Sequence, residues 1–96
     1  MSAKEEILFK LKKAKDELAK KYPIASLALF GSYSRDDYTQ DSDVDILVEI
    51  DGRIGSEFID LAFDLEDVIG KKVDLVSRNG IKPRYFNFIK SDLIYV

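Results

Sequence analysis

The 96-residue sequence contains no cysteine, no histidine and no tryptophan. Without cysteine and histidine, the chain cannot form disulfide bonds, use a cysteine nucleophile or a Ser-His-Asp triad, or bind zinc through thiolates or imidazoles. A metal ion bound by this chain would therefore have oxygen ligands, as magnesium and manganese prefer. Catalysis would fall to aspartate, glutamate, lysine or tyrosine side chains.

Long apolar runs and a strong net charge are also missing. No stretch approaches the roughly 18 consecutive apolar residues of a membrane-spanning helix. The N-terminus carries Lys4, Glu5 and Glu6 where a signal peptide would be apolar, which favours the cytoplasm. The net charge of −3 gives no reason to expect direct binding to nucleic acid. With 46% hydrophobic and 34% charged residues, residues 1–96 are expected to form a single globular domain without a membrane partner.

Charge is unevenly distributed along the chain. Seven acidic residues and no basic residue lie between Asp36 and Asp51, whereas six basic residues and one acidic residue lie between Lys71 and Lys90. One interpretation of both blocks is a solvated surface. The alternative is a site in which metal ions neutralise the acidic block and basic groups receive a polyanion.

The hydrophobic pattern predicts a small α/β (α+β) fold, with three or four strands in a mixed sheet and helices packed on it. Ser2 and Glu5 form a capping-box pattern in front of an amphipathic helix, Ala3–Lys21. Ser56 and Gly70 have the residue types expected before and after a second long helix. The other predicted elements are strands 25–30, 44–50 and 73–76, a short helix 83–90 and a short final strand 93–96.

Three aspartates have the spacing of a metal site. Asp43 and Asp45 lie two apart in a predicted strand, so their side chains point to the same face with Cα atoms about 6–7 Å apart. Two such carboxylates repel each other unless cations lie between them, and a pair of divalent ions serves in-line displacement at phosphorus. Asp74, in an otherwise apolar strand, is the candidate for a third ligand. The alternatives are a turn flank for the first two, and an exposed edge position for Asp74, paired with a neighbouring lysine.

The dipeptide Gly31-Ser32 follows the first predicted strand. Glycine allows a sharp turn and a close approach to a ligand, and the serine hydroxyl adds a donor. If a short helix begins near Ser34, its free N–H groups would point at an anion, which suits the terminal phosphates of a nucleoside triphosphate. By itself, however, Gly-Ser after a strand is commonplace.

The combination is more specific than its parts. Gly31-Ser32, ten further residues, Asp43-Val44-Asp45 and a later aspartate in an apolar strand together resemble the DNA polymerase β-like nucleotidyltransferase superfamily. The chain length and the segments 31–35 and 42–46 are similar to the minimal nucleotidyltransferase (MNT) group within it. The resemblance covers nearly the whole chain.

The resemblance implies a role for each matching residue. Nucleotide contacts would come from Gly31, Ser32, Arg35 and Ser42, with Arg35 contacting phosphate or bracing the loop. Two magnesium ions, or manganese, would be held by the catalytic residues Asp43, Asp45 and Asp74, the last of which would also help to deprotonate the acceptor. The sequence departs from the group at Ser34, where alanine is usual, and at Asp36, where glycine is usual. The acid at position 36 would lie close to the triphosphate.

The same resemblance implies the reaction: transfer of a nucleoside monophosphate, AMP from ATP, to a hydroxyl group. Because 96 residues leave no room for an acceptor-binding domain, a partner is expected to present that hydroxyl. Many MNT chains resemble antitoxins that adenylylate a tyrosine of a HEPN-type RNase toxin. Two alternatives stay open: a non-catalytic module that neutralises a partner by binding, and an enzyme acting on a small molecule with its pocket completed by a dimer mate.

Two further groups of residues near the C-terminus have alternative interpretations. The basic residues around Asp74 are either solvated surface or receive phosphate or a partner's acidic face; they are Lys71, Lys72, Arg78, Lys82 and Arg84. The apolar residues of the last predicted helix are expected to pack mainly in the core, with a partner contact as the alternative; they are Tyr85, Phe86, Phe88 and Ile89.

Overall fold

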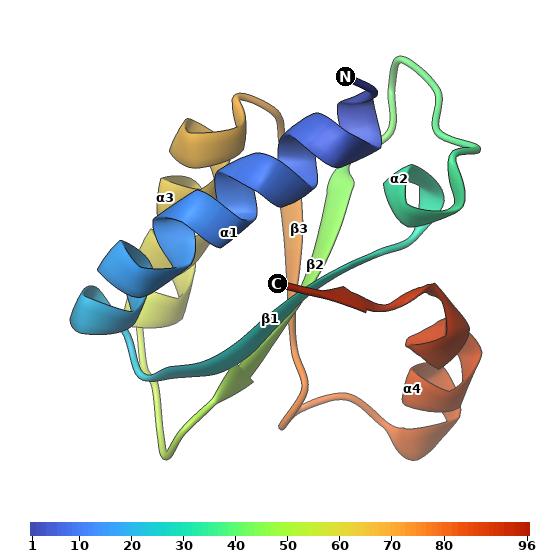
Figure 1. Cartoon of the computed structure of the whole chain (residues 1–96). Helices are drawn as coiled ribbons and strands as arrows, with labels where there is room; N and C mark the ends of the chain where they lie inside the picture. The colour runs from blue at the N-terminus through green and yellow to red at the C-terminus, as the bar shows by residue number, and fades with distance from the viewer.

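A four-stranded mixed sheet organises the computed structural model, which describes residues 1–96 (Figure 1). The fold class predicted from the sequence is confirmed. The strands are β1 Ile24–Phe30, β2 Val44–Ile50, β3 Val73–Ser77 and β4 Ile94–Tyr95. The helices are α1 Ala3–Lys21, α2 Ser32–Arg35, α3 Glu57–Ile69 and α4 Pro83–Ile89, followed by the 3₁₀ turn η1 Lys90–Asp92. None of these helices is both long enough and apolar enough to cross a membrane.

The strands lie in the order β3-β2-β1-β4. β1 pairs antiparallel with both β2 and β4, whereas β2 and β3 are parallel and are joined through α3. The three longer strands are therefore neighbours, as the predicted metal site requires. The register places Phe30 opposite Asp45 and Asp45 opposite Asp74, so one residue of β2 links the end of β1 to the edge strand β3.

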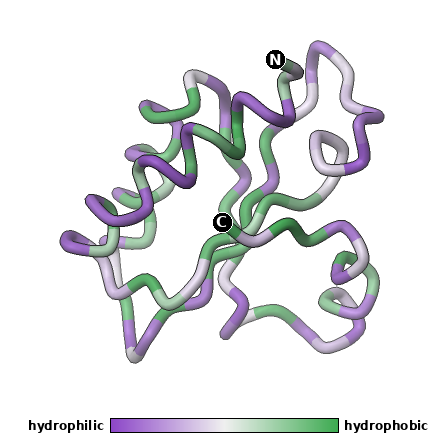
Figure 2. The backbone as a smooth tube through the Cα atoms, viewed as in Figure 1, coloured by the Kyte–Doolittle hydropathy of each residue, from purple (hydrophilic) through white to green (hydrophobic).

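Successive side chains of each strand point to opposite faces of the sheet, and the apolar side chains form a hydrophobic core on each face. Val44, Ile46, Val48 and Ile50 face α1 and α3 and form part of the main core. The opposite face carries a smaller core around α4, made of Ala28, Phe30, Leu47 and Ile89. Figure 2 shows α1 alternating between hydrophilic and hydrophobic residues, as expected for a helix that lies over the sheet.

The helix ends confirm some local predictions and correct others. Ser2 and Glu5 form the predicted capping box, and Gly70 ends α3 with φ of 78°. Ser56 precedes α3 as predicted, but its hydroxyl makes no capping hydrogen bond because its backbone is already helical. The short helix α2 begins at Ser32 instead of Ser34, directly after Gly31.

The segment around α4 is less buried than its composition indicates. Ile89 is buried and Phe86 is half-buried, and the Arg78 guanidinium lies 3.9 Å from the centre of the Phe86 ring. Phe88 and Tyr85 are 78% and 43% exposed, so the prediction that this group packs mainly in the core is wrong for these two side chains. A seven-residue helix on a four-stranded sheet can turn only one narrow face inward.

A hydrogen-bonded cluster fastens the end of α1 to α3. The Tyr22 hydroxyl donates to Asp64 Oδ2 at 2.6 Å, and Lys21 Nζ donates to the same oxygen at 2.9 Å. The hydrogen bond, together with burial, raises the pKa of Tyr22 to about 12, and the two donors lower the pKa of Asp64. Folding is thereby favoured when tyrosine is neutral and aspartate is charged.

We expect Tyr22→Phe to lower the free energy of unfolding by about 1–2 kcal/mol at neutral pH, because a hydrogen bond to a charged acceptor is lost. The raised pKa of Tyr22 means that its contribution is complete below pH 10 and disappears as the pH rises through 12. The lowered pKa of Asp64 means that the contribution also disappears as the pH falls below 3.8. Urea unfolding at several pH values measures this, with Tyr95→Phe as the control at an exposed tyrosine. Equal stability of Tyr22→Phe and the parent at pH 7 would contradict it.

Candidate functional site

Two acidic side chains lie opposite each other on the face of the sheet that carries the smaller core. Asp45 of β2 is in register with Asp74 of β3, and both point away from the face occupied by Val44 and Val73. Asp45 is half-buried, whereas Asp74 is exposed because β3 is an edge strand. The expectation of an exposed edge position for Asp74 is therefore correct, but no ion pair joins it to a lysine.

The backbone at Gly31 lies directly against Asp45. A Cβ atom added to Gly31 would stand 2.0 Å from Asp45 Oδ2 and 2.9 Å from its Cγ. Gly31 also has φ of 77°, in the left-handed region that side chains disfavour. Glycine is thus required here for two reasons, and the turn after β1 is held against the carboxylate of Asp45.

Asp43 is the third acid of the predicted set, and it stands one residue before β2 instead of within it. The charge of Asp43 still affects the pKa of Asp45. Burial, followed by the charges of Asp74 and Asp43, raises the pKa of Asp45 to about 6, with Arg35 acting in the opposite direction. The three carboxylates are therefore electrostatic neighbours.

These acids do not form a ready-made cage. No group of three or more acidic side chains in the structure is arranged to hold a metal ion. In donor chemistry the three acids fit a hard cation: every ligand is an oxygen, and two of the carboxylates face each other across adjacent strands.

α2 is anchored to the C-terminal part of the chain. Arg35 Nε pairs with Asp37 Oδ2 at 2.9 Å, and Arg35 Nη1 pairs with Asp92 Oδ2 at 2.8 Å. The buried Ser34 hydroxyl donates to the Asp92 carbonyl. Of the two roles considered for Arg35, the structure displays the bracing of the loop. The serine at position 34, where alanine is usual, contributes to the same connection.

The backbone conformation of Asp36 bears on the aspartate that stands where the resemblance implies glycine. Asp36 ends α2 with φ of 63° and is the sole non-glycine residue of the chain in the left-handed region. Glycine adopts that conformation without strain, which is a physical reason for the glycine that the resemblance implies at this position. The Asp36 carboxylate forms an ion pair with Lys4 Nζ of α1 at 3.5 Å.

Ser42 has a structural role in the loop before β2. Its hydroxyl accepts a hydrogen bond from the Thr39 N–H at 2.9 Å, and its own N–H donates to the Thr39 carbonyl at 3.1 Å. The predicted nucleotide contact of Ser42 stays a prediction. Ser42 also lines an open hollow of about 410 Å³, which we call the Lys71–Lys72 hollow. Its other lining residues are Tyr33, Gln40, Asp41, Asp43, Lys71 and Lys72.

Two residues around the acids and the α2 turn, Tyr85 and Asp92, were not predicted from the sequence. Tyr85 of α4 was expected in the core, yet its side chain is exposed, and its pKa is raised by burial and by the charges of Asp45 and Asp74. Asp92 binds Arg35 across 57 residues of sequence. No local pattern marks either residue, because both positions depend on how the C-terminal segment packs.

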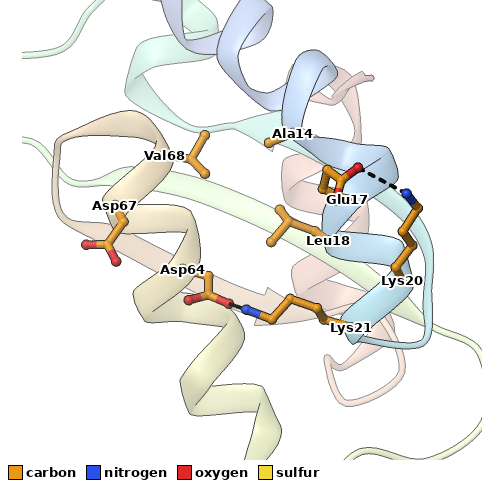
Figure 3. A pocket seen from close by; sticks show the side chains of 8 residues that line it. All are labelled: Ala14, Glu17, Leu18, Lys20, Lys21, Asp64, Asp67 and Val68. Carbon is orange, nitrogen blue, oxygen red and sulfur yellow. Dashed lines mark hydrogen bonds and ion pairs between the residues drawn. The ribbon is translucent and has the colours of Figure 1, made fainter.

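A second hollow, of about 340 Å³, lies between α1 and α3 on the other side of the sheet (Figure 3). Leu18, Ala14 and Val68 form its apolar part. Most charged groups at its rim already have partners, since Lys21 pairs with Asp64 at 2.9 Å and Lys20 with Glu17 at 3.1 Å. This hollow therefore does not compete with Asp45 and Asp74 as a site of chemistry.

Replacing Asp36 tests the backbone explanation. We expect Asp36→Gly to be more stable than Asp36→Ala by about 1 kcal/mol, because a Cβ atom is strained in the left-handed region. Both variants lose the contact with Lys4, so their difference isolates the backbone effect. Urea unfolding of the two purified variants measures it. Equal free energies of unfolding would show that Asp36 carries no strain.

Comparisons with known proteins identify the family. The nucleotidyltransferase domain family matches residues 11–96. The chain is 44% identical over 90 residues to MJ1379 of Methanocaldococcus jannaschii, a candidate protein adenylyltransferase, in an alignment that covers 90% of each chain. It is 37% identical over 94 residues to protein adenylyltransferase MntA of Thermococcus cleftensis, in an alignment that covers 96% of this chain and 94% of that one.

Solved structures show the same fold. A candidate minimal nucleotidyltransferase superposes with a TM-score of 0.78 at 30% identity, covering 98% of this chain and 95% of that one. The same fold occurs in a chain of the complex between an MNT antitoxin and a tri-AMPylated HEPN toxin from Shewanella oneidensis. The TM-score is 0.69 at 22% identity, over 93% of this chain and 70% of that chain. With the family match extending over most of its length, this chain belongs to the nucleotidyltransferase domain family and is a nucleotidyltransferase of the minimal type.

Proposed function

We propose that this chain is a protein adenylyltransferase, which transfers AMP from ATP to a hydroxyl group of a partner protein. The observation that carries the proposal is the placement of Asp45, which lies opposite Asp74 across the β2–β3 pair and against the backbone of Gly31. A turn that approaches a carboxylate so closely brings the proposed phosphate-binding residues beside the proposed metal ligands. The names of the two relatives support the choice of AMP and of a protein acceptor.

Asp43, Asp45 and Asp74 are proposed to hold magnesium, which when bound orients the α-phosphate and neutralises its developing charge. Gly31 and Ser32 border this region at the start of α2. Gly31 lets the backbone pass directly against Asp45. The Ser32 hydroxyl, on a half-buried residue, supplies a donor for a phosphate oxygen. Arg35, held by Asp37 and Asp92, keeps this turn in place.

Asp74 is proposed to receive the proton of the acceptor. It is exposed on the edge strand, so a hydroxyl of another molecule can reach it. The acceptor oxygen forms a bond to the α-phosphorus, the bond between that phosphorus and the oxygen of the β-phosphate breaks, and pyrophosphate leaves with the electron pair. The hydroxyl proton passes to the Asp74 carboxylate and from there to water.

The proposed partner is a HEPN-type toxin, with this chain as its antitoxin. The support is the shared fold with an MNT antitoxin that is bound to a tri-AMPylated HEPN toxin. The acids of this chain lie on an open face and not in an enclosed pocket, which suits an acceptor carried by a protein.

Asp43→Asn combined with Asp45→Asn separates modification from binding. The double variant is expected to fold at least as stably as the parent in urea, because repulsion among the three acids is relieved. It should lose magnesium binding by calorimetry, and it should not transfer label from α-phosphate-labelled ATP to a co-expressed HEPN-type toxin, although the two proteins still co-purify. Glu49→Gln with Asp51→Asn is the matched control. Neutralisation of the toxin by the double variant at equal stoichiometry would refute the catalytic proposal.

Ser32→Ala tests the phosphate-binding turn. Removing one hydrogen bond to a charged phosphate should cost about 1.5–3 kcal/mol, which lowers kcat/KM by roughly 10- to 150-fold. The circular dichroism spectrum and the unfolding midpoint should stay those of the parent, since the backbone bonds of α2 are retained. Ser91→Ala, at an exposed serine, is the control. Unchanged kinetics in Ser32→Ala would remove this residue from the site.

A further inference from the structure

The helix α4 covers the face of the sheet on which Asp45 and Asp74 lie. Ile89 of α4 is buried in the same small core as Leu47 of β2, which follows Asp45 by two residues and therefore points to the same face. Val76, two residues after Asp74 on β3, packs against that core as well. α4 thus adjoins the acids along β2 and β3, across the sheet from α1 and α3 (Figure 1).

The outward side of α4 carries two exposed aromatic side chains. Phe88, at 78% exposure, is the most exposed large hydrophobic side chain within any helix or strand, and Tyr85 is exposed as well. The two residues are three apart in the helix, so their side chains are neighbours on its surface. Phe86 and Ile89 of the same helix turn inward and hold α4 on the sheet. Exposed aromatic neighbours of this kind mark a contact surface for another molecule.

The charged residues in and around α4 are all basic. The segment 78–90 contains four basic residues and no acidic one; they are Arg78, Lys82, Arg84 and Lys90. None of the six ion pairs in the structure includes any of them. Arg78 lies on the ring of Phe86, whereas the other three side chains are exposed. The exposed aromatic pair is therefore accompanied by positive charges without an acidic partner in this chain.

A second exposed apolar pair has the opposite electrostatic character. Ile59 and Phe63 lie one turn apart on the outside of α3, and every charged residue of that helix is acidic. α3 packs with α1 on the other face of the sheet. The chain therefore has two apolar surfaces of opposite charge, and the basic one on α4 is the one that shares its face with Asp45 and Asp74.

We propose that the α4 docking face, formed by Arg84, Tyr85 and Phe88 with Lys82 and Lys90 beside them, binds the partner protein through an apolar surface bordered by acidic side chains. This inference rests on the proposed function and names the surface that brings the acceptor hydroxyl to the proposed proton acceptor. The aromatic side chains supply the apolar contact area that an interface centre requires. The basic side chains pair with carboxylates of the partner, which speeds the encounter and fixes its orientation.

A folded protein suits this face better than a nucleic acid does. Basic and aromatic side chains together also suit single-stranded RNA. A polyanion lying along this face would, however, meet the charges of Asp45 and Asp74, and the net charge of the chain is −3. The carboxylates of a folded partner stand at single positions, so they can meet α4 without approaching those acids.

Phe88→Ala combined with Arg84→Glu tests the α4 docking face. The affinity for a purified HEPN-type toxin is measured by calorimetry in the absence of ATP, so that no AMP is transferred. The double variant is expected to bind the toxin at least about 30-fold more weakly than the parent, which is the effect of losing a dominant interface residue. Phe63→Ala with Lys12→Glu is the matched control, because it changes an exposed phenylalanine and an exposed basic residue on the other face of the sheet. The control should bind as the parent does.

Two further measurements separate docking from folding and from chemistry. Hydrogen exchange of the unmodified parent should slow at residues 82–90 when the toxin is added, and it should stay unchanged at residues 57–63. With ATP and magnesium, the double variant should show a KM for the toxin that is raised by the same factor as the loss of affinity, with kcat retained. Its affinity for ATP should equal that of the parent, because the acids and the turn at Gly31 are unaltered.

The remaining outcomes distinguish the two proposals. If the parent binds the toxin but transfers no AMP to it, the proposed function fails, and the affinities still decide the role of α4. Equal affinities of the double variant and the control overturn the α4 docking face, as does slowed exchange at residues 57–63 in place of 82–90. A parent that does not bind the toxin overturns it too. If a labelled single-stranded RNA binds the parent as tightly as the toxin does and the double variant does not bind it, α4 is a nucleic-acid surface and the inference is wrong.

Discussion

The contact between the Asp45 carboxylate and the backbone of Gly31 is the constraint on which the site depends. The register of β1 with β2 brings the two residues together, and the register of β2 with β3 adds Asp74 from the other side. Burial and neighbouring charge make Asp45 an unfavourable place for a free anion. Burial of apolar side chains in the two hydrophobic cores, on opposite faces of the sheet, offsets the free-energy cost of placing Asp45 there.

Much of the fold could be predicted from the sequence because the signals are local. The apolar stripe of Ala3–Lys21 and its capping box lie within single helical turns, and the apolar runs of β1 and β2 are interrupted by glycine or polar segments. The lone charge of Asp74 in an apolar strand indicated it as a partner for Asp45, but the register that sets the two residues opposite each other could not be predicted from the sequence. Strand order and register are long-range properties, and the two separate apolar runs of β2 and β3 contain no local signal that they pair in parallel.

The features that could not be predicted depend on packing between distant segments. Arg35 and Asp92 are far apart in sequence, and Tyr85 approaches Asp45 only because α4 covers the opposite face of the sheet from α1 and α3. Ser56 has the residue type of a cap but not the backbone conformation. Aspartate is one of the few non-glycine residues that adopt the left-handed conformation, but only the geometry at the end of α2 reveals that Asp36 does so.

In the proposed function, the exposed position of Asp74 on an edge strand separates chemistry from recognition. An enzyme with an enclosed pocket must reshape that pocket whenever its substrate changes, and each change risks the alignment of its catalytic groups. Here the acids and the turn at Gly31 are fixed by the sheet, while the choice of partner depends on surfaces that those residues do not form. Mutations could therefore redirect such a small domain from one acceptor to another by altering only its periphery, which allows one catalytic frame to serve several different partners.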